Sequence, residues 1–310
     1  MNKPESQKKV WCLMGPTAVG KTDWACEWLT QAPFEIVSVD SAMIYREMNI
    51  GTAKPDTAFL QQYPHHLIDL RDPCERYCAA DFCEDVLRVC DELFARQKIP
   101  LLVGGTMMYF HALQNGLSEL PTADAHVRAQ LLAEAEREGW DHLHARLARI
   151  DPQSAQRIHA HDTQRIQRAL EVHQLTGQSL SSLLMKKPQR EAMSFINVAL
   201  IPESRAWLHD RIAQRFMQML ADGFLEEVSA VTQKWALTPD HPALRCVGYR
   251  QAWAYLQGQI DYSTFCDKGI AATRQLAKRQ LTWLRQWPCD HVFYAEQRPS
   301  LARLREFITA

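Results

Sequence analysis

The chain has 310 residues, a formal net charge of −1 and 46% hydrophobic residues. This length suffices for one large or two ordinary domains with a well-buried core. The near-neutral charge excludes a protein that is basic over its whole surface, so any nucleic-acid-binding surface has to be local. The sequence shows neither an N-terminal apolar signal region nor a long uncharged stretch. We therefore expect a cytoplasmic protein that is not exported and does not bind a membrane.

The nine cysteines agree with a reducing compartment. Four of them, Cys74, Cys78, Cys83 and Cys90, are close together in sequence, but their spacing lacks the C-x₂-C pairs of a zinc site. We interpret them as small buried thiols rather than metal ligands.

The first chemical motif is the octapeptide 15–22, which follows the apolar run 10–14 and matches the phosphate-loop pattern G-x-x-x-x-G-K-[ST]. Its glycines let backbone N–H groups converge on a diphosphate, and the following helix offers its N-terminus to the same charge. We expect Lys21 to reach the phosphate oxygens and the Thr22 hydroxyl to bind a bridging Mg²⁺ ion. The predicted diphosphate-binding residues are Gly15, Pro16, Thr17, Ala18, Val19, Gly20, Lys21 and Thr22. The alternative is a chance match to a turn without a ligand.

A short apolar strand is predicted at 34–39, and it ends in Asp40 and Ser41. In open α/β sheets the ligand-contacting residues collect at the carboxyl ends of strands, which places Asp40 beside the phosphate loop. Asp-Ser is also a common helix or turn cap, so position alone leaves a structural and a functional role equally open.

Two more strands are predicted at 66–69 and 100–103, separated by a helix from about 79 to 97. The second of them leads into Gly104, Gly105 and Thr106, where paired glycines allow close backbone approach. Thr106 then brings a hydroxyl to the same edge of the sheet, unless this segment is a plain turn.

Strand signals disappear between 120 and 190, where we predict helices only. Thr122 can cap a helix that Gly139 stops, and Asp151 and Asp162 open two further helices, the last of which ends at 176–177. The segment 186–188 is interpreted as an exit linker, strands follow at 195–200 and 291–294, and the rest of the C-terminal part is helical. The predicted fold is an α/β core like that of P-loop NTPases, a parallel sheet with helices on both faces, formed by 1–119 and 191–310 and interrupted by a helical insertion at 120–190.

Three local basic features stand out against the neutral total charge. At about 100° per residue Arg274, Lys278 and Arg285 share one helix face, which suits a phosphodiester backbone, while Leu276, Leu281 and Leu284 are expected to lie away from it. Gln164, Arg165 and Arg168 open the last insertion helix, where the helix dipole adds to their charge. The segment 245–250 combines two arginines with Tyr249, whose ring could stack on a base. Charge runs of this kind are more often only solvated faces.

The motifs together resemble the bacterial tRNA dimethylallyltransferases, also called tRNA isopentenyltransferases. The matching stretches are 15–22, 40–45, 49–55, 103–106, 168–172, 247–250 and 273–285, and they run in the family's order across nearly the whole chain. The resemblance implies an enzyme that moves a dimethylallyl group from dimethylallyl diphosphate to N6 of adenosine 37, beside the anticodon of a tRNA. It also implies a monomer that binds the anticodon stem-loop. Met43 departs from the pattern, since many members carry glutamine there, and no stretch resembles the C-terminal zinc finger of eukaryotic members.

The resemblance also implies roles for single residues. Lys21 and Arg215 would stabilise the leaving diphosphate together with Mg²⁺, Asp40 would accept the N6 proton, and the target base would lie near Asp40 and Thr106. The implied catalytic residues are Asp40, Thr106, Lys21 and Arg215. The implied tRNA-binding residues are Asp40, Ser41, Ala42, Met43, Thr106, Arg128, Gln164, Arg165, Ile166, Gln167, Arg168, Arg245, Cys246, Val247, Gly248, Tyr249, Arg250, Arg274, Lys278, Arg279 and Arg285.

The rival interpretations are an ATP-dependent kinase acting on a small acceptor, which would use the same loop, and a non-catalytic RNA-binding module.

Overall fold

The computed structural model describes residues 8–116, 118, 120–185 and 193–309. They divide into two compact units, the first formed by the chain up to Gln114 and again from Ala192, the second by Asn115–Glu191. The predicted linker 186–188 and the predicted segment ends at 119 and 190 lie outside the described residues.

The first unit is built on one six-stranded sheet with the order β3-β2-β4-β1-β5-β6. Every strand pair in it is parallel. The strands are β1 (Lys9–Met14), β2 (Phe34–Val39), β3 (His65–His66), β4 (Ile99–Gly104), β5 (Ser194–Ile201) and β6 (His291–Tyr294). The predicted parallel α/β fold is therefore confirmed. The strand predicted at 66–69 is wrong beyond His66, because Leu67 and Asp69 have φ angles of 61° and 54°, which no strand contains.

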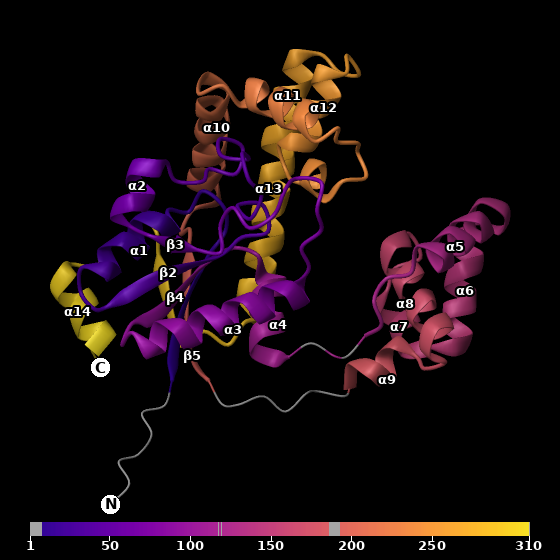
Figure 1. Cartoon of the computed structure of the whole chain (residues 1–310), viewed down its shortest axis with the longest axis horizontal. Coiled ribbons are helices and arrows are strands. Elements are labelled where there is room, and N and C mark those ends of the chain that lie inside the picture. Colours follow the sequence, from indigo (N-terminus) through magenta and orange to yellow (C-terminus); the bar gives the residue numbers. More distant parts are fainter. Residues whose placement is uncertain (1–7, 117, 119, 186–192, 310) are drawn as a thin grey trace, which may run out of the picture. The chain divides into compact units, whose positions relative to one another are not determined.

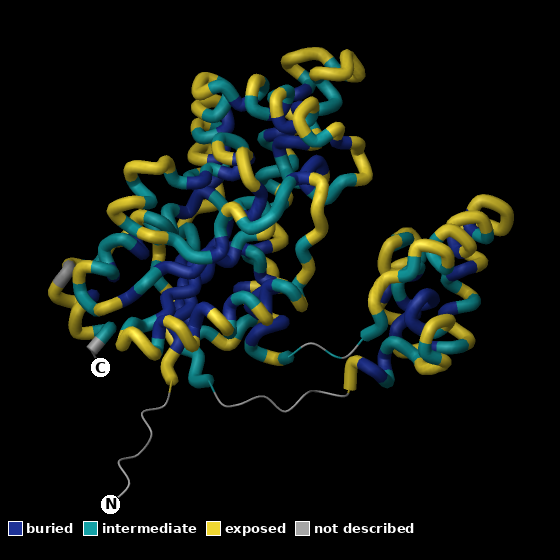
Figure 2. The backbone as a smooth tube through the Cα atoms, in the orientation of Figure 1, coloured by how far each residue is buried: buried dark blue, intermediate teal, exposed yellow. Residues whose placement is uncertain are grey.

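Helices cover both faces of this sheet (Figure 1). The helices of the first unit are α1 (Lys21–Leu29), α2 (Thr57–Gln62), α3 (Ala79–Ala95), α4 (Met107–Asn115), α10 (Arg205–Ala221), α11 (Phe224–Lys234), α12 (Tyr249–Leu256), α13 (Tyr262–Gln286), α14 (Leu301–Thr309) and the 3₁₀ turn η1 (Pro242–Arg245). Of these, α11, α12 and η1 pack in a separate cluster with α10 and α13. Trp11 and Leu13 of β1 pack in one core cluster with Trp24 and Trp28 of α1. Because alternate strand residues point to opposite faces, Cys12 lies on the other face, where it accepts a hydrogen bond from Gln114 of α4. The centre of the first unit is accordingly buried (Figure 2).

The second unit is helical, with α5 (Ala125–Glu138), α6 (Trp140–Ile150), α7 (Pro152–Arg157), α8 (Thr163–Thr176) and α9 (Leu180–Met185). The caps predicted at Asp151 and Asp162 are confirmed, since their carboxylates accept from the backbone N–H groups of Ser154 and Arg165. The cap predicted at Thr122 is wrong: Asp124, two residues later, accepts from the Val127 N–H at 2.9 Å. The helices α6 and α9 were not predicted.

No described helix combines the length and the apolar character that a membrane crossing requires. Among the described residues, no group of three or more His, Cys, Asp and Glu side chains is arranged to hold a metal ion, and the cysteines are free thiols. Cys83 and Cys90 are buried as predicted, but the prediction is wrong for Cys74 and Cys78, which are exposed.

Candidate active site

The candidate site lies where the carboxyl ends of β1, β2 and β4 meet, as expected for a parallel sheet. The phosphate loop follows β1, Asp40 follows β2, and Gly105 and Thr106 follow β4. All three segments line one cavity of about 820 Å³. Residues of α10, α13 and the segment before α12 line its other walls. The structure thus brings together the predicted catalytic residues Lys21, Asp40, Thr106 and Arg215.

The phosphate loop is held tightly against the sheet. The Gly15 N–H donates to the Gly104 carbonyl at 3.3 Å, and a Cβ atom at position 15 would lie only 2.5 Å from the Leu200 carbonyl oxygen. Gly20 has a φ of 96° and is the N-cap residue of α1, so the loop passes directly into the helix N-terminus. This backbone therefore requires glycine at both ends of the loop.

Lys21 and two arginines supply positive charge to this part of the cavity. The Lys21 ammonium donates to the Pro16 carbonyl at 2.8 Å. Burial lowers the pKa of Lys21 to about 8, against the effect of Asp40 and with a further contribution from Arg215. Burial also lowers the pKa of Arg215, although Asp40 opposes this. Arg211, one turn before Arg215 on α10, donates from Nε to the Ala18 carbonyl at 2.9 Å. Positive charge of this kind suits a multiply charged anion.

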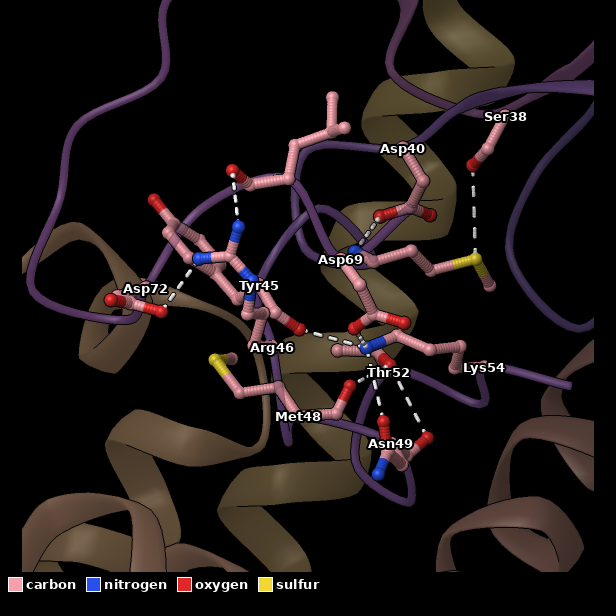
Figure 3. A network of polar contacts seen from close by, with 12 residues as sticks. Ser38, Asp40, Tyr45, Arg46, Met48, Asn49, Thr52, Lys54, Asp69 and Asp72 are labelled. Carbon is pink, nitrogen blue, oxygen red and sulfur yellow. Dashed lines mark hydrogen bonds and ion pairs between the residues drawn. The ribbon is translucent and has the colours of Figure 1, made fainter. Parts of the chain in front are cut away.

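Asp40 shows both roles that the sequence left open. Its Oδ1 atom accepts from the backbone N–H groups of Ala42 at 2.8 Å and Met43 at 3.3 Å, which is the turn-capping role. The same carboxylate lines the cavity, and among the described residues no hydrogen bond is made to Oδ2 (Figure 3). Thr106 lies next to it, because its Oγ1 atom accepts from the Ser41 N–H at 3.1 Å. The cap orients a carboxylate that keeps one oxygen for a ligand.

A second, buried anchor fixes the loop that forms the adjacent wall. The Lys54 side chain is 2% exposed and donates to the Tyr45 carbonyl, to Asn49 Oδ1 and to Asp69 Oδ1 at 2.8, 3.0 and 2.6 Å (Figure 3). Glu227 of α11 accepts from the backbone N–H groups of residues 49, 50 and 51 on the same loop. With its charge fully paired, Lys54 holds Thr52 and Ala53 at the cavity surface. Sequence reasoning missed this role, because the 49–55 segment carried no chemical motif of its own.

The oxygen donors for a divalent cation are few. Thr22 lies in the first turn of α1, and its hydroxyl and the Asp40 carboxylate belong to the same cavity. Hard oxygen ligands of this kind fit Mg²⁺, which is commonly bound by one or two protein oxygens together with substrate phosphates. The described residues offer no complete cage, so phosphate oxygens would have to finish the coordination.

On α13 the cavity-facing residues differ from the predicted basic face. Arg279 lines the cavity together with Leu276, Gln280 and Trp283. Lys278 and Arg285 are exposed, whereas Arg274 is partly buried and does not line the cavity. The predicted placement of Leu281 is wrong: at 100° per residue it comes within roughly 20° of Arg274 and roughly 40° of Arg285, and it packs against the core.

The segment 245–250 forms another part of the cavity wall, where Arg245, Cys246, Val247 and Gly248 line the cavity. The stacking role predicted for Tyr249 is wrong in this packing. Its side chain is 1% exposed, its hydroxyl donates to Glu227 Oε1 at 2.6 Å, and its ring packs edge-on against Phe224. Burial raises the pKa of Cys246 to about 12, with Asp40 adding to the effect, so this thiol stays protonated. Arg250 is exposed and lies outside the cavity lining.

Within the helical unit, the predicted RNA-binding residues fall into two groups. Gln164 and Arg165 are exposed at the start of α8. Arg128 and Arg168 instead donate to Glu171, whose side chain is fully buried. Two more predicted residues are also engaged within the unit: the Ile166 side chain is fully buried in its core, and Gln167 Nε2 donates to the backbone carbonyl of residue 128. The side chain of Ile166 is therefore not available to RNA, which corrects that prediction.

Comparisons with known proteins agree with this arrangement. Residues 43–287 match the family model described as IPP transferase. The chain is 58% identical over 306 residues to a protein of Legionella pneumophila (strain Corby) named tRNA dimethylallyltransferase, and the match covers 97% of each chain. A protein of the same name from Paraburkholderia phymatum is 56% identical over 281 residues, covering 89% of each.

Two solved structures also resemble the chain. The tRNA isopentenylpyrophosphate transferase of Bacillus halodurans has a TM-score of 0.71 and 32% identity, over 98% of this chain and 96% of that one. A eukaryotic dimethylallyltransferase acting on tRNA has a TM-score of 0.80 over 97% of this chain and 80% of that one, and at 24% identity it supports the fold alone.

Proposed function

The chain belongs to the IPP transferase family of tRNA dimethylallyltransferases, and on that premise we propose how its cavity carries out the transfer. The donor is dimethylallyl diphosphate and the acceptor is N6 of adenosine 37 in the anticodon loop of a tRNA. One observation carries the proposal: a phosphate loop, a carboxylate with a free oxygen and a pair of guanidinium groups line the same cavity.

The donor diphosphate binds at the phosphate loop. When the allylic C–O bond breaks, negative charge grows on the departing diphosphate, so Lys21 and Arg215 stabilise the transition state more than the ground state. The backbone N–H groups of the loop and of the first turn of α1 act in the same sense. A Mg²⁺ ion held by Thr22 and the phosphate oxygens supplies further neutralisation when it is bound.

The acceptor base enters from the side of Asp40 and Thr106. The lone pair of an adenine N6 amine is delocalised into the ring, so the amine needs a proton acceptor as the new N–C bond forms, and Asp40 Oδ2 is that acceptor. The products are N6-(dimethylallyl)adenosine and diphosphate, and the proton passes to Asp40. An unpaired loop base can be extruded into such a cavity at low cost.

RNA contacts come from the exposed cations at the cavity and on the helical unit. Arg279 and Arg245 lie at the cavity walls, and Arg165 is exposed on α8. These side chains are placed to bind phosphates of the anticodon stem-loop.

All groups needed for the reaction come from one chain, which favours a monomer, and we expect it to act in the cytoplasm, where its substrates are.

The test is a direct assay of the donor. Protein and Mg²⁺ are incubated with unmodified tRNA and either dimethylallyl diphosphate or ATP, and the tRNA nucleosides are weighed by mass spectrometry. Dimethylallyl adenosine is expected with the first donor only. No mass gain with dimethylallyl diphosphate, together with turnover of ATP, would refute the proposal and favour a kinase, since a phosphate loop alone does not distinguish the two donors.

A further inference from the structure

One buried side chain connects the donor side of the cavity to the acceptor side. Gln280 of α13 is 8% exposed. Its Oε1 atom accepts from the Thr17 N–H of the phosphate loop at 2.8 Å, and its Nε2 atom donates to the Gly105 carbonyl at 2.9 Å. The two loops belong to different strands, so a single amide bridges the ends of β1 and β4.

The bridge depends on a close approach that only glycine permits. A Cβ atom added at Gly105 would lie 2.3 Å from Gln280 Nε2 and 3.2 Å from its Cδ atom. A distance of 2.3 Å between these atoms is far inside van der Waals contact. An alanine at position 105 would therefore displace the Gln280 amide, and the two positions are matched to each other.

Further contacts connect Gly105 to Asp40, the proposed proton acceptor. Gly105 precedes Thr106, whose hydroxyl accepts from the Ser41 N–H, and Ser41 follows Asp40 in the chain. The Gln280 amide thus joins the loop that would hold the leaving diphosphate to the segment that carries Asp40. The Gln280 amide is uncharged and transfers no proton in the reaction, so its contribution is geometric.

We propose that Gln280 is a positioning residue for the transfer: its amide sets the spacing between the leaving diphosphate and the adenosine N6 at Asp40. This rests on the proposed function. A displacement of about 1 Å between reacting groups lowers a reaction rate by on the order of 10²-fold, so a bridge of this kind controls the rate through the spacing of the two loops that it joins. Loss of the bridge should therefore lower the transfer rate of the complex with both substrates bound, and it should leave the affinity for either substrate unchanged.

The first test removes the Gln280 amide that bridges the two loops. Gln280→Ala is expected to lower the single-turnover transfer rate at saturating substrates by on the order of 10²-fold. The dissociation constants for tRNA and for inorganic diphosphate should stay within about threefold, because the loop N–H groups, Lys21 and Thr22 remain. Gln280→Glu keeps an acceptor for the Thr17 N–H but removes the donor to the Gly105 carbonyl, and a loss of the same order is expected.

The control removes an amide elsewhere in the same unit. Gln114 donates to Asn197 Oδ1 at 2.7 Å and accepts from Asn197 Nδ2 at 3.2 Å, outside the cavity. Gln114→Ala should lower the thermal midpoint in the way that loss of a hydrogen-bonded amide does, with the transfer rate unchanged. An equal rate loss in Gln114→Ala and Gln280→Ala would mean that Gln280 is only a packing residue, and would overturn the proposal.

A double-mutant cycle tests the matched pair. Gly105→Ala should lower the rate by displacing the Gln280 amide, and Gly105→Ala combined with Gln280→Ala should be no slower than the slower single variant. Rate losses that multiply would overturn the proposal, because the two changes would then act separately.

A wild-type chain that transfers no dimethylallyl group would overturn the proposed function as well, whereas active wild type with unaffected Gln280 variants would overturn only this inference.

Discussion

The substitution Glu171→Gln should destabilise the helical unit and leave the sheet unit intact. Glu171 Oε1 accepts from Arg128 Nε at 2.8 Å and from the backbone N–H of Asp124 at 2.9 Å, and Oε2 accepts from Arg168 at 2.6 Å. The carboxylate thus joins α8 to the N-terminus of α5. An amide at this position would offer one acceptor oxygen in place of two and would turn N–H donors toward a guanidinium.

The size of the effect follows from burial. Removing one partner of a buried ion pair costs about 3–5 kcal/mol. The Glu171 side chain is 0% exposed, but those of Arg128 and Arg168 are 36% and 28% exposed, so water can solvate part of the charge left behind. We therefore expect a loss of about 2–3 kcal/mol, at or below the lower limit of the range for fully buried pairs.

The measurement is hydrogen exchange followed by mass spectrometry on peptides of α5 and α8. Protection should fall in these helices and stay unchanged in β1 and β4. Glu136→Gln on the exposed side of α5 is the matched control, and its effect should remain within about 0.5 kcal/mol. An opening free energy for Glu171→Gln equal to that of the control would refute the reasoning and show that the two arginines need no buried partner.

The ion pairs of Glu171 with Arg128 and Arg168 also make the stability of the helical unit depend on pH in the acid range. Burial opposes the shift, but hydrogen bonds from Arg128 and Arg168 hold the pKa of Glu171 below its ordinary value. Because the pKa of Glu171 is lower in the folded state than its unfolded-state value of about 4.3, the carboxylate adds to the free energy of unfolding at pH values above 4.3. This contribution is lost as the pH falls through the folded-state pKa. Glu171→Gln should remove that part of the acid dependence.

Four further outcomes are expected. Asp40→Asn should leave tRNA and donor binding nearly unchanged and lower the single-turnover transfer rate by on the order of 10²–10⁴-fold; a variant at nearly full rate would return Asp40 to the role of a cap. Because burial lowers the pKa of Lys21 to about 8, kcat/KM for the donor should fall as pH rises above that value, and a profile unchanged in Lys21→Ala would contradict this. Arg279→Ala should weaken tRNA binding and reduce the slope of affinity against salt by a little under one unit, which a titration across a salt series decides. Arg165→Ala should also reduce this slope without loss of thermal stability, whereas Arg168→Ala should lower stability first.

The part of the fold that the sequence predicted rests on local patterns. The phosphate loop is contiguous, and its glycines, lysine and threonine stand at fixed spacing, so its place between β1 and α1 follows from eight residues. The rule that strand ends share an edge then placed Asp40 and Thr106 beside it. The predicted roles of these residues in binding and transfer remain predictions.

The errors share a different cause, which is long-range packing. Gln280 reaches residues 17 and 105, and no local pattern announces a contact between positions so far apart. Tyr249 has the composition of a stacking residue, but Glu227 and Phe224 bury it. The ion pairs that Arg128 and Arg168 make with the buried Glu171 were also not predicted, and the roles of these two arginines in RNA binding remain predictions. Except for Arg168 and Glu171, which both lie on α8, the partners lie on different elements.

The position of β1 within the sheet has a consequence for how the protein is made. β1 pairs with β4 on one side and with β5 on the other, and β5 is synthesised only after the whole helical insertion. Until then the apolar run 10–14 presents an unpaired strand edge, the kind of surface that templates aggregation. Arg215 and Gln280 emerge later still. The phosphate loop thus leaves the ribosome before the residues that complete its cavity, so we expect chains that stop within the insertion to bind no diphosphate and to require chaperones.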